Sequence, residues 1–166
     1  GIDLVNSPVI SGDFANCTGN EERGGVSFNW DGTQFVSAHP SGWPDARIYV
    51  ADFNKKTGAM TIESSCTPTN AFPYDVTFSP DNSRVIYSDN LGNVSTLDIS
   101  SGVGATIAAS ATLIAGGGTG HSAIEIGADG NLYRSSLGGN NFCRLAGSLN
   151  SGGALTVNGN LVGNTS

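Results

Sequence analysis

The sequence is poor in charge, and poorest in basic charge. Charged residues make up 13% of the 166 residues, and 7 Lys and Arg against 14 Asp and Glu give a net charge of −7. A chain of this sign has little attraction for a polyanion, so we expect no nucleic-acid partner. No stretch approaches the roughly 20 apolar residues that are needed to cross a bilayer, so we also expect no membrane span.

Histidine and cysteine are scarce as well. His39 and His121 are the only histidines, and the three cysteines, Cys17, Cys66 and Cys143, lie far from them and from one another. Zinc sites need ligands at short, regular spacings, which this sequence does not offer. It also contains no Gly-x-Ser-x-Gly nucleophile motif. We therefore predict no zinc site and find no catalytic motif.

Gly, Ser, Thr and Asn stand where many proteins have charge. These residues compete poorly in helix interiors and favour turns, so the composition predicts short strands. Three segments, 26–32, 76–82 and 124–130, alternate apolar and polar residues and end in Asp-Gly or Asp-Asn. Their aspartates, Asp31, Asp81 and Asp129, are 50 and 48 residues apart. A repeat of this length is typical of β-propeller blades.

Each repeat continues with three more predicted strands. They cover residues 34–38, 47–52 and 59–63 in the first repeat, 84–88, 93–98 and 105–108 in the second, and 131–135, 141–145 and 154–157 in the third. Asp-Gly and Gly-containing turns between alternating runs are strong hairpin signals. Four strands per repeat indicate an all-β fold made of propeller blades. An unrelated β-sandwich with the same turn spacing is the alternative.

The repeats divide the chain into about three blades of one propeller domain. We assign the blades to residues 21–70, 71–118 and 119–166, and residues 1–20 to the outer strand of a preceding blade. A propeller needs at least four blades to close, so this one is incomplete and is expected to be a fragment, unless another chain or further sequence completes it. The expected partners are therefore other segments or copies of the same protein. Cys17 and Cys66 fall at matching positions of adjacent blades, too far apart for a disulfide, so we expect unpaired cysteines or bonds to parts outside this sequence.

Residues 78–88, 94–99, 107–114 and 124–133 resemble a known group of propellers. They are similar to the lactonase-like, YVTN-type propellers of large Bacteroidetes surface proteins. Those proteins often carry PKD domains and a type IX secretion sorting signal, and many are gliding-associated. The chain departs from the group at Arg134 and Ser135, where a small apolar residue commonly follows the tyrosine. The resemblance and the shortage of Lys and Glu imply an extracellular or cell-surface location.

The longer loops are predicted to gather at one rim of the blades. Segments 39–46, 89–92 and 136–141 follow the second strands, and 69–75 and 116–122 connect the blades. Loops on a rigid scaffold are where binding residues concentrate. The candidate rim residues are His39, Trp43, Asp45, Tyr74, Asp75, Asp89 and His121. They could bind a glycan or protein, act in hydrolysis, or serve structure alone, with His121 and Asp75 hydrogen-bonding neighbouring blades and Trp43 covering a blade edge.

Two weaker patterns concern calcium and glycosylation. Asp89, Asn90 and Asn93 resemble an oxygen-rich calcium loop, but no closing Glu follows. Calcium is therefore a weak candidate, and we expect no other cofactor. Sequons mark Asn16, Asn93 and Asn164 as possible N-glycosylation sites.

The leading functional hypothesis from the sequence is a scaffold that is not an enzyme. It would belong to a secreted or cell-surface protein and make adhesive, protein or glycan contacts through the loop-rich rim. A lactonase-like hydrolase that uses His39, His121 and the rim aspartates is one alternative. A structural subunit of an extracellular filament or sheath is the other.

Overall fold

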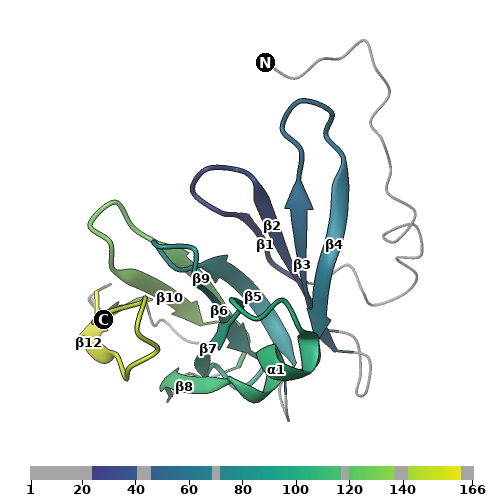
Figure 1. Cartoon of the computed structure of the whole chain (residues 1–166). Coiled ribbons are helices and arrows are strands. Elements are labelled where there is room, and N and C mark those ends of the chain that lie inside the picture. The colour runs from purple at the N-terminus through teal and green to yellow at the C-terminus, as the bar shows by residue number, and fades with distance from the viewer. Residues whose placement is uncertain (1–23, 41–45, 69–71, 117–119, 137–141, 162–166) are drawn as a thin grey trace.

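The computed structural model describes residues 24–40, 46–68, 72–116, 120–136 and 142–161, and the account below is confined to them. They form three four-stranded antiparallel sheets and one short helix (Figure 1). The first sheet holds β1 (Val26–Phe28), β2 (Gln34–His39), β3 (Arg47–Phe53) and β4 (Met60–Cys66). The second holds β5 (Pro73–Phe78), β6 (Arg84–Asp89), β7 (Val94–Asp98) and β8 (Thr112–Ala115). The third holds β9 (Ser122–Ile126), β10 (Leu132–Ser136), β11 (Phe142–Ala146) and β12 (Thr156–Asn160).

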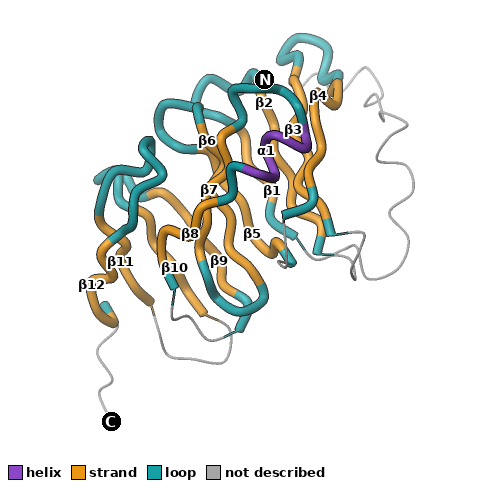
Figure 2. Tube along the Cα trace, turned by 60° about the horizontal axis from the view of Figure 1, so that its bottom comes forward, coloured by secondary structure: helices purple, strands orange, loops and turns teal. Residues whose placement is uncertain are grey.

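The arrangement of the sheets confirms an incomplete β-propeller. Within each sheet the strands pair in the order in which they occur in the chain. The three sheets stand side by side without closing into a ring (Figures 1 and 2). Their first strands form the inner edge of the arc, where β5 contacts both β1 and β9. We call the three sheets blade 1, blade 2 and blade 3.

The tight turn between the first two strands of each blade is built on its aspartate, as predicted. The carboxylate oxygen Oδ1 of Asp31, Asp81 and Asp129 accepts the backbone N–H two residues later, at 3.0, 3.0 and 3.1 Å. The residue after each aspartate has a positive φ, between 60° and 75°. Glycine tolerates that conformation and Asn is among the few other residues that do, which explains Asp-Gly, Asp-Asn and Asp-Gly in the three repeats.

Each blade has two faces, and the strand register decides which side chains each face carries. Paired residues point to the same side of a sheet, and successive residues along a strand alternate between sides. We call the face toward the preceding blade position the upstream face and the opposite one the downstream face. In blade 2, for example, the paired residues Phe78 and Val85 lie on the upstream face, and Thr77 and Ile86 lie on the downstream face.

The hydrophobic core lies between the blades. At the first interface, the downstream face of blade 1 packs against the upstream face of blade 2, and the residues are Val36, Ala38, Ile48, Val50 and Cys66 with Val76, Phe78, Val85, Tyr87 and Leu97. The second interface joins blade 2 to blade 3 through Ile86, Val94, Ile114 and Ala115 with Ile124, Leu132, Leu145, Leu149 and Leu155. In addition, the Ser88 hydroxyl donates to the carbonyl of Ser122 across this interface. Blade-to-blade burial therefore stabilises the arc.

The predicted strand at 105–108 is wrong, because these residues form the helix α1 (Gly104–Ala109). Alanine is the strongest helix former, and this segment is rich in it. Ile107 anchors the helix, since its side chain is fully buried in the first blade interface. Gly104 lies so close to the backbone of β4 that an added Cβ would stand 2.1 Å from the Ser65 carbonyl oxygen. The outer strand of blade 2 is instead β8, which follows the helix (Figure 1).

The outer strands of the other two blades differ from prediction only in their bounds. β4 extends the predicted segment 59–63 to Cys66, and β12 begins two residues after the predicted start of 154–157. Leu155, just before β12, is buried and its N–H donates to the carbonyl of Ile114 at 2.7 Å, which ties blade 3 to β8. In the part of the chain that the structure describes, no helix has the length and apolarity to cross a membrane.

Candidate functional site

The structure brings four of the predicted rim residues toward one end of blades 2 and 3. Tyr74 and Asp75 lie near the start of β5, His121 just precedes β9, and Asp89 ends β6. The Tyr74 and His121 rings are in contact, with centroids 4.6 Å apart. The backbone N–H of Asn90 donates to the carbonyl of Phe72 at 3.1 Å, which joins the β6–β7 turn to the segment that enters blade 2.

Asp75 connects the inner strands of two blades. Its Oδ2 accepts the backbone N–H of Ile124 in β9 at 2.7 Å, and its Oδ1 accepts its neighbour's N–H, that of Val76, at 2.9 Å. Ile124 lies on an inner-edge strand, where backbone N–H groups have no further strand to pair with. Asp75 therefore satisfies an edge donor of the next blade. The prediction that Asp75 bonds a neighbouring blade agrees with this contact.

The Asp75 side chain leaves no room for a side chain at position 25 of blade 1, which is glycine. A Cβ added to Gly25, in the segment that leads into β1, would stand 1.7 Å from Asp75 Oδ1. Half-buried between blades, the Asp75 carboxyl has a raised pKa because burial disfavours its charged form. The N–H groups of Ile124 and Val76 oppose this effect without cancelling it. Asp75 is thus more basic than an ordinary surface aspartate.

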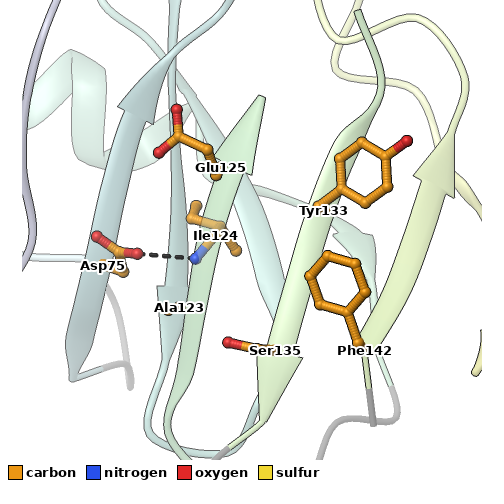
Figure 3. A pocket seen from close by; sticks show the side chains of 7 residues that line it. All are labelled: Asp75, Ala123, Ile124, Glu125, Tyr133, Ser135 and Phe142. Atoms are coloured by element: carbon orange, nitrogen blue, oxygen red, sulfur yellow. Dashed lines mark hydrogen bonds between the residues drawn. The ribbon is translucent and has the colours of Figure 1, made fainter. Parts of the chain in front are cut away.

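A hollow of about 430 Å³ opens beside Asp75, across β9 and onto the downstream face of blade 3 (Figure 3). Its lining residues are Asp75, Ala123, Ile124, Glu125, Tyr133, Ser135 and Phe142. The rings of Tyr133 and Phe142 stack with centroids 5.6 Å apart and planes 15° apart. The hollow therefore combines two carboxyl groups, a serine hydroxyl and a flat aromatic wall.

The Tyr133 hydroxyl is held at one end of this aromatic wall. It donates to Oδ2 of the turn residue Asp129 at 2.9 Å, and this hydrogen bond raises the pKa of Tyr133. The pKa of Asp129 is lowered in turn, chiefly by its hydrogen bonds with Asn131. The hydroxyl is thereby kept protonated and its ring is fixed against Phe142.

The hydrogen bonds of Asp89 are those of a residue that stabilises a turn. It is 7% exposed and accepts the backbone N–H groups of Leu91 and Asn93, and the side-chain amide of Asn93, all within 2.9 Å. These contacts close the β6–β7 turn by the same local bonding that makes aspartate common in turns. The Asn93 side-chain amide is one of the donors in this turn, and its possible glycosylation remains a prediction. Among the described residues no group of three or more His, Cys, Asp or Glu side chains could hold a metal ion, and the calcium prediction remains open.

The remaining predicted residues are apart from this cluster or outside the described part of the chain. His39 ends β2 in blade 1, where its ring packs edge-on against Tyr49 at 4.9 Å. Trp43 and Asp45 fall within 41–45, outside the described residues. The same holds for the sequons at Asn16 and Asn164, for Cys17, and for the predicted strand within residues 1–20. Cys66 and Cys143 are buried free thiols.

Sequence reasoning missed the hollow and the role of Arg134. Glu125, Tyr133, Ser135 and Phe142 alternate with core residues in predicted strands, and the register alone would have placed them on one face. Arg134, which departs from the family pattern, is 4% exposed and donates to the carbonyls of Gly92 and Gly116 at 2.9 and 3.5 Å. It thus fastens blade 3 to the β6–β7 turn of blade 2.

Comparison with solved structures identifies proteins of the same fold. A candidate 6-phosphogluconolactonase from Bacteroides uniformis matches 80% of this chain and 41% of its own, with a TM-score of 0.59 and 14% identity. The periplasmic gluconolactonase of Pseudomonas aeruginosa matches 78% of this chain and 40% of its own, with a TM-score of 0.56 and 17% identity. A candidate 6-phosphogluconolactonase from Bacteroides fragilis matches 79% and 40%, with a TM-score of 0.55 and 17% identity. The structural neighbours are lactonase-like β-propellers.

The likeness at this level of identity establishes the fold, and the chain spans about two fifths of the length of these proteins. No protein-family model and no curated protein sequence matches the chain. The structural neighbours support the lactonase-like part of the resemblance that was drawn from the sequence. Nothing in the comparisons links the chain to PKD-containing or type IX secretion proteins.

These neighbours correct the functional hypothesis from the sequence. We expected a scaffold for adhesion that is not an enzyme, but the structures of the same fold are named as lactonases, which favours the hydrolase alternative. The expectation erred because it took the lack of a nucleophile motif as evidence against catalysis. Hydrolysis of a lactone by an activated water needs a base and no protein nucleophile.

Proposed function

We propose that this chain is part of a lactonase-type hydrolase that opens the ring ester of a sugar lactone. The observation that carries the proposal is the fold, which covers about four fifths of the chain in neighbours named as gluconolactonases. The Asp75 hollow gives the proposal a place in the molecule. It joins a carboxyl group of raised pKa to an open cavity at the inner edge of the blades.

In the proposed reaction, Asp75 acts as a general base toward a water molecule. The water oxygen attacks the lactone carbonyl carbon while its proton passes to the Asp75 carboxylate. The ring carbon–oxygen bond then breaks, the proton held by Asp75 passes to the departing ring oxygen and so regenerates the carboxylate, and the product is the open hydroxy acid. A base works best when its pKa approaches the working pH, and burial moves the pKa of Asp75 in that direction.

The contacts of Asp75 suit this role. Each carboxylate oxygen accepts one backbone N–H, which fixes the orientation of the group. A carboxylate offers about four lone-pair sites, so acceptor positions remain for a water molecule. The stacked Tyr133 and Phe142 rings provide an apolar wall of the kind against which the C–H face of a sugar ring packs. Tyr74 and His121, in contact at the rim, are the second group that we propose to meet the substrate.

The test is turnover of a panel of sugar lactones, including glucono-1,5-lactone, by the intact protein with and without divalent cations. Asp75→Asn should lower kcat/KM by about 10²- to 10⁴-fold, the usual contribution of a general base. Glu63→Gln is the matched control, because Glu63 is an exposed carboxylate on the outer strand β4. Equal losses in both variants, or no turnover above the spontaneous rate under any condition, would refute the proposal.

We also propose that the protein works outside the cytoplasm. The support is that one structural neighbour is a periplasmic enzyme, together with the shortage of Lys and Glu in the sequence. The narrower prediction of an extracellular or cell-surface location, with secretion of the type IX kind, is part of this proposal. Fractionation of the native cells tests it, and recovery of the intact protein in the cytoplasmic fraction alone would contradict it.

A further inference from the structure

Strand β5 contains a β-bulge beside the candidate site. Its register with β6 shifts between Pro73 and Asp75, so Tyr74 is the extra residue of the pairing. In a regular strand, successive side chains point to opposite faces. Here the Tyr74 ring contacts His121, just before β9, and the next residue, Asp75, accepts a hydrogen bond from β9 itself. Bulges are common beside active sites, where they re-aim a side chain, and this one gives β5 two consecutive side chains that contact blade 3.

The residue opposite Asp75 in the neighbouring strand β6 is Ser88. The two are paired in register, so their side chains lie on the same face of the sheet, toward blade 3. The Ser88 hydroxyl donates to the carbonyl of Ser122. The Asp75 carboxylate accepts the N–H of Ile124 at 2.7 Å (Figure 3). Because Ser122 and Ile124 are two residues apart in β9, this carbonyl and this N–H project from the same edge, and the Asp75–Ser88 pair bonds that edge as a neighbouring strand would.

The contact between Ser88 and Ser122 is buried. Both residues are 0% exposed, and a buried hydroxyl that loses its partner is left unsatisfied at a cost in stability. Within blade 3, the Ser122 hydroxyl donates to the carbonyl of Gly120 at 3.4 Å and lies 3.3 Å from the Ser136 hydroxyl. The start of β9 is therefore held from its own blade and, through Ser88, from blade 2.

We infer that Ser88 is a positioning residue for Asp75, because it holds the start of β9 where the Ile124 N–H reaches the Asp75 carboxylate. Ser88 is not among the described residues that line the hollow, so it acts through β9 and not on a substrate. Without this contact, the carboxylate would lose a fixed donor and would be free to turn away from the hollow. The inference rests on the proposed role of Asp75 as a base, but the orientation of Asp75 by Ser88 can be measured without turnover.

The first test follows Asp75 and Ile124 by NMR in Ser88→Ala. Hydrogen exchange of the Ile124 N–H should speed up about 10-fold, the effect of losing a hydrogen bond of ordinary strength. The pKa of the Asp75 carboxyl should rise above its wild-type value, because a donor that favours the charged form is weakened. Ser88→Thr keeps the hydroxyl and should return both measurements toward the wild type.

The pKa has to be read on the Asp75 carboxyl itself, because other titratable groups surround it. Glu125 and Tyr133 line the same hollow, and Tyr74 and His121 are in contact at the rim. A carbon-13 signal assigned to Asp75 separates its titration from theirs.

Ser79→Ala is the matched control. Ser79 is 2% exposed, and its hydroxyl donates to the Asp81 carboxylate at 2.7 Å. The control therefore also removes a buried serine hydroxyl from blade 2, but beyond the opposite end of β5 from Asp75. It should leave both the Ile124 exchange rate and the Asp75 pKa unchanged.

The second test is turnover of the lactone panel. Ser88→Ala should lower kcat about 10-fold and keep KM within about twofold, since a displaced base slows the chemical step without removing a substrate contact. The acid limb of kcat/KM should move to higher pH together with the pKa of Asp75. If Ser88→Ala does not fold, Ser88→Cys, which replaces the hydroxyl by a weaker donor, should show the same changes at smaller size.

The possible failures are distinguishable. Unchanged Ile124 exchange and an unchanged Asp75 pKa in the folded Ser88 variant would overturn the inference and leave the proposed function standing. Equal changes in Ser79→Ala would overturn it too, because the effect would then be one of general stability. A wild type without turnover would refute the proposed function, and the two NMR measurements would still decide whether Ser88 orients Asp75.

Discussion

The backbone N–H of Ile124 donates to Oδ2 of Asp75 across 2.7 Å, so one side chain of blade 2 completes the hydrogen bonding of the inner strand of blade 3. The other oxygen of the same carboxylate, Oδ1, lies against Gly25 of blade 1. A single residue thereby contacts three successive blades. Its contribution to stability and its proposed chemical role can be measured separately.

The pH dependence of stability should show the raised pKa of Asp75. A carboxyl whose pKa is higher in the folded than in the unfolded chain binds more protons when folded, so its contribution falls as pH rises. The loss begins near the ordinary pKa of 3.8 and is complete above the raised folded value. Urea unfolding from pH 3 to pH 7 gives the free energy of unfolding of the wild type and of Asp75→Asn. As pH rises, this free energy should fall more, or rise less, in the wild type than in the variant. Parallel curves would contradict the prediction.

Acidification should destabilise the turns, because the pKa values of their aspartates are shifted in the opposite direction to that of Asp75. Hydrogen bonds with Ser100 lower the pKa of Asp98, and hydrogen bonds with Thr33 lower the pKa of Asp31. Groups with lowered folded pKa values give stability that is present above 3.8 and is lost as pH falls through the folded value. Asp98→Asn should therefore flatten the loss of stability between pH 4 and pH 2. NMR titration of the Asp98 carboxyl checks the shift directly, and a midpoint at or above 3.8 would refute it.

Gly25→Ala should destabilise the first blade interface by about 1–3 kcal/mol, the usual cost of overpacking. The added methyl group meets Asp75 Oδ1 at 1.7 Å and the Asp75 Cα at 2.9 Å, so either the side chain or the backbone must move. Thermal unfolding measures the cost. Repeating the substitution in an Asp75→Ala background should recover part of it, since only the clash with the backbone remains. An additive double variant would show that the two residues do not interact.

Arg134→Met should loosen the β6–β7 turn without unfolding the blades. It removes the donor to the carbonyls of Gly92 and Gly116, and we expect a loss of about 1–3 kcal/mol in the free energy of unfolding. Hydrogen exchange at Gly92 and Asn93 should speed up more than exchange in β5. Lys56→Met, at an exposed position in the β3–β4 turn, is the control. Uniform acceleration across all blades would mean that Arg134 supports the whole fold instead.

Ile107→Ala should cost about 2–5 kcal/mol, because Ile107 is fully buried between blades 1 and 2 and its removal leaves a cavity. Leu113→Ala removes a similar side chain that is 60% exposed, and it should cost far less. Comparable losses in chemical denaturation would mean that α1 is not anchored as the structure shows.

The sequence was sufficient to predict the blades because the determining signals are local. Asp31, Asp81 and Asp129 bond their own turns, and the alternation that follows each turn specifies which residues face the core. The predicted strand at 105–108 was wrong because a buried Ile107 in an alanine-rich segment fits a helix as well as a strand, and only packing against β4 decides. The hollow was missed because Asp75 and Tyr133 are 58 residues apart and come together only through the stacking of blades.

Among the rim candidates, Tyr74, Asp75 and His121 gather in the structure, while His39 belongs to another blade.

The two described thiols allow the opening of each blade interface to be timed chemically. Cys66 lies in the contact between blades 1 and 2, and burial raises its pKa to about 11, so in the closed arc it is protected from alkylating agents by both access and protonation. Cys143 is paired with Arg134 in register and faces blade 2 from the other side. The ratio of their iodoacetamide labelling rates, measured by mass spectrometry of the two cysteine-containing peptides, would therefore report which blade interface opens first.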